Sequence, residues 1–466
     1  MRIKKMRTDV DMSQGNILPL LLNFALPLML GNLFQQMYNM VDTWVVGNYV
    51  SNEAYSAVGT VGPIINTLIG FFTGLASGAG VVISQYYGAR NMEDVGKTVH
   101  TALVMTFFLG LVFTAVGVGM VPAMLRLMQT PAEVLPEATL YLRICFSGVL
   151  GLMIYNMGSG ILRAVGDSNR PFLLLVACAL VNTVLDLVFV LRFKMGVEGV
   201  ALATIISQAV SAVLVLVILL REKSCVRVSV RALKADMPIL RKIFRVGIPA
   251  AMQMAITAFS NVFIQSYINH FGADFMAGWT TYSKIDQVMF LPMQSVALAA
   301  TTFVGQNLGK GQVDRAKKGI RCAFLISEVS TVCLLIPVMF FAPALVGFFN
   351  AKPEVVAYGT TILRVISPFF LASCVNNVYA GALRGAGNSV APMFIMLSSF
   401  VLFRQVYMFA VSHLFPDAML PVMMGYPAGW MVCSAATMVY YRRVKLEKYR
   451  ITAVAWGTSE SIVGKI

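Results

Sequence analysis

The stretch MGSGILRAVGDSNRP at residues 157–171 recurs as VYAGALRGAGNSVAP at residues 378–392, and six of the 15 positions are identical. The register extends well beyond this motif, because other polar and glycine residues pair at the same spacing of 221 residues. Pairs outside the motif include Asn156/Asn377, Gln85/Gln306 and Gly88/Gly309, and pairs within it include Gly160/Gly381 and Arg163/Arg384. In an apolar chain, such a repeat is typical of two membrane bundles that face each other across a cavity, as in transporters.

The composition favours a membrane protein. The chain has 466 residues, 58% of them hydrophobic and 12% charged, whereas soluble proteins carry about 25% charged residues. A membrane helix needs about 20 mostly apolar residues, and twelve segments qualify: 17–46, 57–83, 95–121, 138–162, 171–191, 197–220, 243–269, 276–304, 319–341, 356–383, 391–414 and 418–441. We predict an all-α polytopic membrane protein with 12 transmembrane helices in two six-helix, pseudo-symmetric lobes.

The net charge of +15 is explained by topology, so we expect the lipid bilayer and no nucleic acid as a partner. With an inside start, 28 of the 36 Lys and Arg residues fall on one side, and such an excess marks the cytoplasmic face. Both termini are therefore predicted to be cytoplasmic. The predicted division is a tail at 1–16, an N-terminal lobe at 17–220, a linker at 221–242, a C-terminal lobe at 243–441 and a tail at 442–466.

Nothing in the sequence indicates catalysis. The seven cysteines show neither zinc spacing nor paired extracellular positions and are predicted to be free thiols. Phosphate-binding Gly-rich loops, metal-ligand clusters and nucleophile–His arrangements are also missing from the sequence. We therefore predict a protein that is not an enzyme and has no cofactor and no structural metal site.

Asp42, Asp186, Asp286 and Glu328 lie inside predicted spans. Charged groups at membrane depth usually face a cavity or a partner. Asp42 and Asp186 both lie in the outer half of the first lobe. Asn182 stands one helical turn from Asp186, and Thr204 in the next span lies at a similar depth.

Two carboxylates with an amide and a hydroxyl form a candidate site for a proton or a transient Na⁺. The alternative is that Asp42 lies in the membrane interface and Asp186 is a satisfied structural group. The second half has no acid at the corresponding positions, so the site is not part of the shared scaffold. Asp286 could pair with the neighbouring Lys284, and Glu328 could face the bundle interior.

Further polar residues could line a central cavity: Gln35, Tyr38 and Asn39 in span 1, Gln253 and Asn261 in span 7, and the repeat pair Asn156 and Asn377. Hydrogen bonding between helices is the alternative use of such residues. Pro27 and its partner Pro249 interrupt spans 1 and 7. We predict Pro27 to be a moving hinge, because it shares span 1 with Asp42.

The chain resembles the MATE (multidrug and toxic compound extrusion) transporters over residues 14–445. The resemblance rests on VDTWVVG at 41–47, SQYYGARN at 84–91, VGQNLGKG at 304–311 and the twinned LRAVGDS and LRGAGNS turns. Asp42, Asn182, Asp186 and Thr204 resemble the cation site of the DinF-like branch. The resemblance implies a V-shaped pair of lobes that exports cationic or amphipathic compounds in exchange for H⁺ or Na⁺. A monomer in a bacterial or archaeal plasma membrane is expected.

The alternative function is a flippase for lipid-linked oligosaccharide or peptidoglycan precursors. A flippase that handles phosphate headgroups should present several Arg or Lys side chains to its cavity. With the other Lys and Arg residues assigned to the two faces of the membrane, Lys284 and Arg404 remain as intramembrane bases, whereas acids cluster in the first lobe. The sequence therefore favours export of small molecules.

Overall fold

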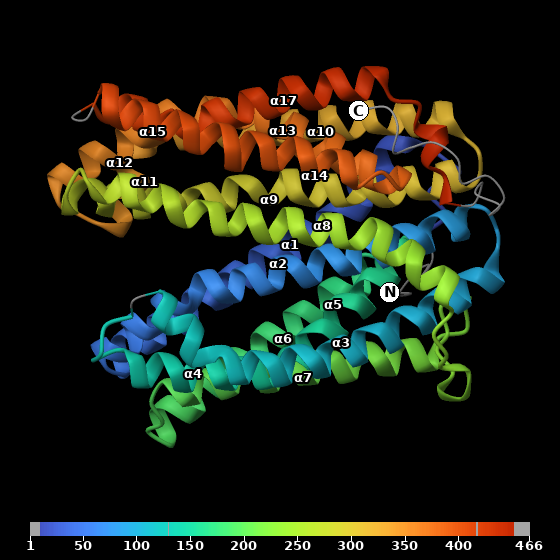
Figure 1. Ribbon diagram of the computed structural model, residues 1–466, viewed down its shortest axis with the longest axis horizontal. Coiled ribbons are helices and arrows are strands. Elements are labelled where there is room, and N and C mark those ends of the chain that lie inside the picture. The colour runs from blue at the N-terminus through green and yellow to red at the C-terminus, as the bar shows by residue number, and fades with distance from the viewer. Residues whose placement is uncertain (1–9, 129, 416–417, 452–466) are drawn as a thin grey trace, which may run out of the picture.

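The computed structural model describes residues 10–128, 130–415 and 418–451, without the side chains of several residues in α1, α2 and α8. The first half forms α1 (Ile17–Tyr49), α2 (Asn52–Gly88), α3 (Met92–Leu127), α4 (Leu135–Ser147), α5 (Val149–Ala164), α6 (Asn169–Leu187) and α7 (Val197–Arg221). The second half forms α8 (Met237–Asn269), α9 (Ala273–Gly309), α10 (Val313–Phe340), α11 (Ala342–Phe349), α12 (Pro353–Ile366), α13 (Phe370–Ala386), α14 (Val390–Leu397), α15 (Arg404–Leu414), α16 (Met419–Met423) and α17 (Gly425–Arg443). The two halves are separate bundles of parallel and antiparallel helices (Figure 1).

Apart from the short α11, the helices of the described residues make twelve passes, because four passes are built from two helices each. The α4–α5 pass bends by 45°, a π-helical turn at Ser398–Phe403 joins α14 to α15, and a 3₁₀ turn at Ser367–Phe369 joins α12 to α13. Within the described residues, nine helices are long and apolar enough to cross a membrane, or ten with the bent pair. The other two passes, α8 and α16–α17, carry more polar or basic residues.

Contacts between the bundles follow the internal repeat. Helix α2 packs along α8, and α1 packs along α9, and these two pairs are equivalent under the repeat. Glycines bring α2 and α8 into backbone contact: a Cβ at Gly74 would lie 2.5 Å from Ala251 Cα, and one at Gly78 would lie 2.3 Å from Gly247 Cα. Side chains larger than hydrogen therefore have no room at this crossing.

The ends of α2 and α9 meet in the same way. A Cβ at Gly88 would lie 1.9 Å from the Gln306 carbonyl oxygen, and a Cβ at Gly309 would lie 2.0 Å from the Gln85 carbonyl oxygen. Gly88 and Gly309 are repeat partners, as are Gln85 and Gln306. The local pseudo-two-fold axis therefore passes between these two helix ends, and the lobes are in backbone contact there.

The two glutamine side chains each cross to the other lobe. Gln85 Nε2 donates to the Gly385 carbonyl at 3.0 Å, and Gln306 Nε2 donates to the Ala164 carbonyl at 2.9 Å. Residues 164 and 385 are again 221 apart. Both glutamines are fully buried, so each bond satisfies a polar group that would otherwise be costly to bury.

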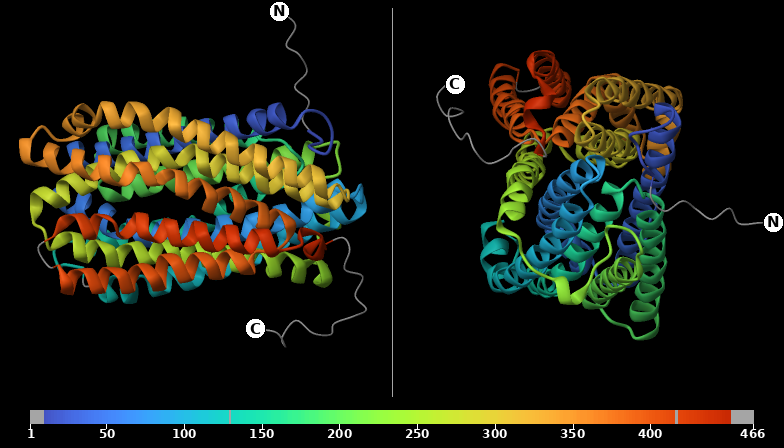
Figure 2. Two further views of the ribbon diagram at one scale, coloured as in Figure 1. Left: turned by 90° about the horizontal axis from the view of Figure 1, so that it is seen from above. Right: turned by 90° about the vertical axis from the view of Figure 1, so that its right-hand side faces the viewer.

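The terminal segments of the chain also bind at this contact between the lobes. The Met12 amide donates to Gln306 Oε1 at 2.9 Å, and the Ile451 amide donates to Gln85 Oε1 at 2.7 Å. The described chain therefore begins and ends at the same end of the molecule, where the linker from α7 to α8 also lies (Figures 1 and 2). The bundles are in contact at this end and diverge toward the opposite end (Figure 1).

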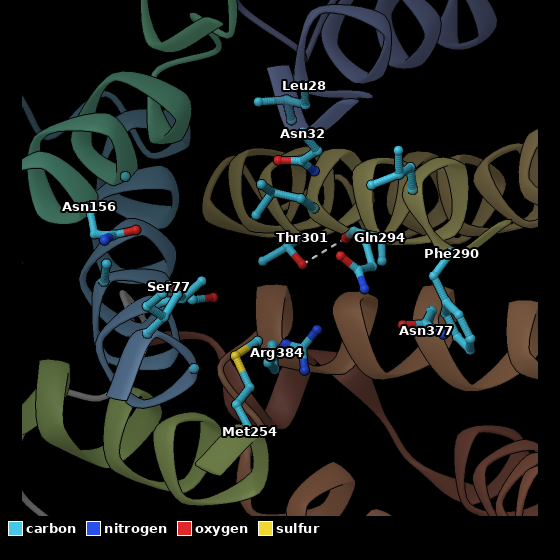
Figure 3. Close-up of a pocket in the computed structure, with 18 of the residues that line it drawn as sticks. Leu28, Asn32, Ser77, Asn156, Met254, Phe290, Gln294, Thr301, Asn377 and Arg384 are labelled. Carbon is cyan, nitrogen blue, oxygen red and sulfur yellow. Dashed lines mark hydrogen bonds between the residues drawn. The ribbon is translucent and has the colours of Figure 1, made fainter. Parts of the chain in front are cut away.

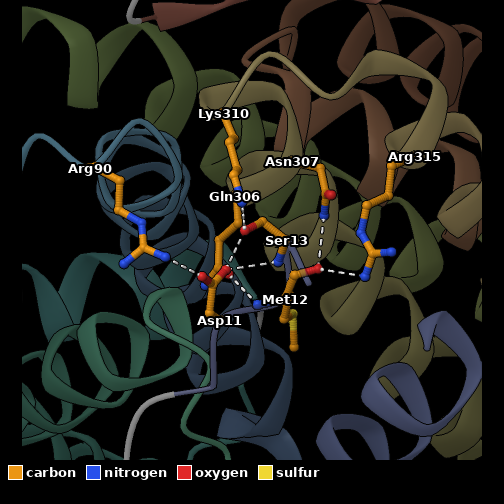
Figure 4. A network of polar contacts seen from close by, with 8 residues as sticks. All are labelled: Asp11, Met12, Ser13, Arg90, Gln306, Asn307, Lys310 and Arg315. Carbon is orange, nitrogen blue, oxygen red and sulfur yellow. Dashed lines mark hydrogen bonds and ion pairs between the residues drawn. The ribbon is translucent and has the colours of Figure 1, made fainter. Parts of the chain in front are cut away.

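An ionic network fixes the N-terminal segment in place (Figure 4). Asp11 pairs with Arg90 at 2.5 Å, and Lys310 Nζ donates to Ser13 Oγ at 3.0 Å. Burial opposes ionisation of Asp11, but hydrogen bonds from Ser13 and the charges of Arg90 and Lys310 outweigh it and lower the pKa of this carboxyl. Residues from both lobes thus hold this segment across their junction.

Candidate coupling site and central cavity

The first lobe contains two adjacent carboxyl groups, one of them fully buried and the other partly buried. Asp42 lies on α1 and Asp186 near the end of α6, and these two helices pack along each other. Asp186 is fully buried, and its carboxyl lies next to that of Asp42. Asn182, one turn earlier on the same face of α6, is 1% exposed. Tertiary packing thus places these three polar side chains together.

Within the described residues, five buried polar atoms of this cluster have no hydrogen-bond partners. They are Oδ1 of Asp42, both carboxylate oxygens of Asp186 and both amide atoms of Asn182. Buried polar groups are almost always hydrogen-bonded, and a buried ionised carboxylate without a partner is very costly. Two adjacent carboxylates are both acceptors, so a proton or a cation between them can supply the missing interaction. The cluster has the chemistry expected of a site for H⁺ or Na⁺.

Thr204 is the fourth residue of the predicted ion site. Thr204 lies on α7, which packs along α6, and its hydroxyl donates to the Val200 carbonyl at 3.0 Å. Only the lone pairs of this hydroxyl therefore remain for a cation. Tyr38 lies one turn before Asp42 on α1 and is close to it.

A cavity of about 720 Å³ lies between the lobes. Side chains from both bundles point into it, including Asn32 of α1, Asn156 of α5, Gln294 of α9 and Asn377 of α13 (Figure 3). Of the residues predicted to line a substrate cavity, four belong to its wall: Gln35, Asn156, Gln253 and Asn377.

Two of the other predicted cavity residues, Tyr38 and Asn39, are not part of this wall. Tyr38 faces Asp42 instead, and Asn39, one turn beyond Gln35 on α1, is exposed outside the cavity. The prediction placed Tyr38 and Asn39 of span 1 in the wall, whereas the cavity follows α1 only as far as Gln36. The side chain of Asn261 lies outside the described residues.

The repeat pair Asn156 and Asn377 has the same geometry in both lobes. Each amide nitrogen donates to the carbonyl four residues earlier in its own helix, Leu152 or Ser373, at 2.9 Å. This bond leaves the amide oxygen available to the cavity. The two walls therefore offer matching hydrogen-bond acceptors.

The remaining intramembrane acids occupy different surroundings. Asp286 lines the cavity and accepts a hydrogen bond from the Tyr282 hydroxyl at 3.1 Å. Lys284 does not pair with it but lies over the Phe349 ring, 5.3 Å from the centroid. Glu328 on α10 is partly buried, outside the cavity wall.

The expectation that Lys284 and Arg404 are the only bases available to a cavity is wrong. Arg163, Arg384 and Arg404 all line the wall. Arg163 and Arg384 stand in the last turns of α5 and α13, and helical side chains lean toward the helix N-terminus. Their guanidinium groups therefore extend back along the helix toward the cavity rather than toward the nearer end of the molecule. The sequence held one signal for these arginines. Each follows a repeat-related glycine, Gly160 or Gly381, and these glycines let the helices pack closely.

Comparison with known proteins identifies the family. A family model described as MatE matches residues 27–188 and 249–409. The chain is 29% identical over 432 residues to the probable multidrug resistance protein YpnP of Bacillus subtilis, covering 93% of this chain and 96% of that protein. It is 27% identical over 434 residues to the probable multidrug resistance protein NorM of Thermotoga maritima, covering 92% and 93%. A solved structure, an outward-facing multidrug resistance MATE family transporter of the MOP superfamily, superposes with a TM-score of 0.88 at 23% identity, covering 93% and 96%.

The chain therefore belongs to the MatE family. It is a multi-pass membrane transporter, not an enzyme, with small molecules as substrates. The predicted all-α membrane fold with two pseudo-symmetric lobes of six passes is confirmed.

Proposed function

We propose that the protein is a secondary active antiporter that exports small amphipathic drugs or metabolites in exchange for H⁺ or Na⁺. Asp42, Asn182, Asp186 and Thr204 would bind the coupling ion as a transported substrate. The observation that carries this proposal is the adjacent carboxyl pair in the first lobe, whose buried oxygens have no hydrogen-bond partners within the described residues. The relatives named as multidrug resistance proteins support export as the direction of transport.

The antiporter is proposed to belong to the DinF-like branch, because the carboxyl pair lies in the N-terminal lobe and the second lobe has no equivalent pair. We place it in a bacterial or archaeal plasma membrane as a monomer, with both termini and the linker cytoplasmic. The division into lobes 17–220 and 243–441, with linker 221–242 and tails 1–16 and 442–466, is part of the proposal. In this orientation the contact between the lobes closes the cytoplasmic end, as in an outward-facing state.

Reconstituted vesicles test coupling directly. A pH gradient and a Na⁺ gradient are imposed separately, and accumulation of a cationic dye (rhodamine 6G) and an anionic dye (flavin mononucleotide) is followed. We expect one of the two gradients to drive accumulation of at least one dye above protein-free vesicles. No accumulation of either dye under either gradient would contradict an antiporter.

A flippase for lipid-linked precursors retains one supporting observation. Three arginines line the cavity, so the cavity presents several basic side chains, as a flippase that handles phosphate headgroups should. The same cavity is also lined by aromatic rings and by Asp286, and the curated relatives named above are described as multidrug resistance proteins. We therefore keep export of small molecules as the proposed function.

Pro27 is proposed to be the hinge through which ion binding acts. It lies inside α1, the helix that carries Asp42, and it lines the cavity. Proline lacks an amide proton, so α1 misses a helical hydrogen bond there and bends at a low cost. Neutralising the carboxyl pair would then change the preferred angle between the two parts of α1.

The hinge predicts a distance change within the first lobe. Spin labels at Met37 on α1 and Met120 on α3, both exposed side chains, should change separation with pH or with Na⁺. The change should disappear in Asp42→Asn and shrink in Pro27→Ala. Pro63→Ala, which alters a proline inside α2, is the matched control and should respond like wild type. A response that survives in Asp42→Asn would rule out this coupling route.

A further inference from the structure

The charges around the central cavity are mainly positive. Among the described residues that line it, three are arginines, Arg163, Arg384 and Arg404, and one is an acid, Asp286. The carboxyl of Asp286 already accepts a hydrogen bond from Tyr282. A cavity of this composition does not match the cationic part of the substrate class expected from the sequence, because guanidinium groups repel cations in a low-dielectric site.

Two of these arginines have unused hydrogen-bonding capacity. Among the described residues, neither Arg163 nor Arg384 forms an ion pair, and the Nε atoms of both are buried without a partner. The hydrogen bond that Arg384 donates to Gln253 Oε1 is long at 3.5 Å. A guanidinium carries five donors in a planar fork that matches the geometry of a carboxylate or a phosphate.

Arg384 is placed where a ligand would meet it. Its side chain extends from α13 into the space that Thr301 and Gln294 of α9 also border, with Met254 of α8 beside it (Figure 3). Arg163, its repeat partner, lines the same cavity from α5 in the first lobe. Because the two arginines come from different lobes, an anion bound between them would contact both lobes at once.

The rest of the wall is aromatic. Six rings line the cavity: Tyr155, Phe172, Phe290, Phe400, Tyr426 and Trp430. Such rings bury large flat surfaces and stack favourably on other rings. A ligand site of this kind, apolar with a few convergent polar groups, suits a small amphipathic molecule.

We propose that this cavity binds aromatic anions, with a carboxylate or phosphate group held by Arg384 and Arg163 and the ring system packed against the aromatic wall. This inference rests on the proposed export function and specifies its substrate class. A structural alternative is that both arginines only complement the negative ends of their own helices. That role predicts a loss of thermal stability on substitution, without any change in selectivity between charged and neutral ligands.

Equilibrium binding to the purified full-length protein separates these roles, because it requires no ion gradient. Flavin mononucleotide and riboflavin share one ring system and differ in a single phosphate, and the fluorescence anisotropy of the flavin reports their binding. We expect flavin mononucleotide to bind at least about tenfold more tightly than riboflavin, as for a charge-assisted bidentate contact. In Arg384→Gln this ratio should fall toward one, with riboflavin affinity unchanged, and Arg384→Lys should recover part of it.

Arg143→Gln is the matched control, since Arg143 is an exposed arginine on α4, outside the cavity wall. It should keep the wild-type ratio. Equal affinity for the two flavins in wild type, or an unchanged ratio in Arg384→Gln, would overturn the proposal. Loss of flavin mononucleotide binding in nanodiscs that contain phosphatidylglycerol would also overturn it, because the arginines would then serve a lipid headgroup. Gradient-driven export of rhodamine 6G without flavin mononucleotide binding would refute this inference alone and leave the antiporter in place.

Discussion

Asp42→Asn and Asp186→Asn are each expected to reduce gradient-driven export to the level of protein-free vesicles. The two carboxyl groups lie side by side, and the buried oxygens of Asp186 and one oxygen of Asp42 have no hydrogen-bond partner within the described residues. An amide has nearly the same volume but cannot take up a proton at working pH, and it contributes no charge to a bound Na⁺. Either substitution should therefore remove the energetic link between ion binding and the conformational change.

Folding and coupling can be separated in these variants. Both should insert in the membrane and melt at or above the wild-type temperature, because substitution removes a desolvated charge. Asp274→Asn is a suitable control: Asp274 forms an exposed pair with Lys352 at 2.6 Å, and such pairs contribute little. It should transport like wild type. Wild-type export by either Asp42→Asn or Asp186→Asn would exclude the carboxyl pair from coupling.

Gly88→Ala and Gly309→Ala are expected to prevent closure of the end that carries the termini. The added Cβ atoms would lie 1.9 Å and 2.0 Å from backbone carbonyl oxygens of the facing helix. A backbone carbonyl inside a helix cannot rotate away as a side chain can, so the helices must separate. Both variants should therefore favour a conformation in which this end is open, and export should be lost because the transport cycle cannot proceed through both states.

The separation can be measured between two repeat-related surface positions. Glu93 at the start of α3 and Asp314 at the start of α10 are both exposed, and spin labels there span the junction. Their distance distribution should shift to longer values in both glycine variants. Gly119→Ala on α3 is the control, because a Cβ there meets nothing within 4 Å. An unchanged distribution in Gly88→Ala would mean that the contact between α2 and α9 does not decide closure.

The candidate ion site was largely predictable from the sequence because its signal is local. A carboxylate at membrane depth is costly wherever it points, so Asp42 and Asp186 could be singled out from the hydropathy of their own segments. Helical periodicity then placed Asn182 beside Asp186. The adjacency of Asp42 and Asp186 depends on the packing of α1 along α6, and the sequence could only indicate it through similar depth.

The cavity was less predictable, because a wall is defined by where helices converge. Asn39 follows Gln35 at helical spacing, yet it is exposed where α1 has left the wall. Arg163 and Arg384 lie near span ends and were not counted as intramembrane bases. Their side chains extend for several bonds, so the direction in which they lean decides whether they reach the cavity. Counting residues along a span gives the depth of a residue but not the direction of its side chain.

The sequence by itself determined the number of passes, the two-fold repeat and the acids that need a partner, because each follows from composition and spacing within short segments. Only the tertiary structure decided which residues from distant parts of the chain meet. Examples are the hydrogen bonds that the Met12 amide donates to Gln306 and the Ile451 amide donates to Gln85, and the backbone contact between α2 and α9 at Gly88 and Gly309. The physical reason is that a helix forms and inserts on local hydrogen bonds and apolar surface, whereas contacts between lobes depend on the shapes of both partners.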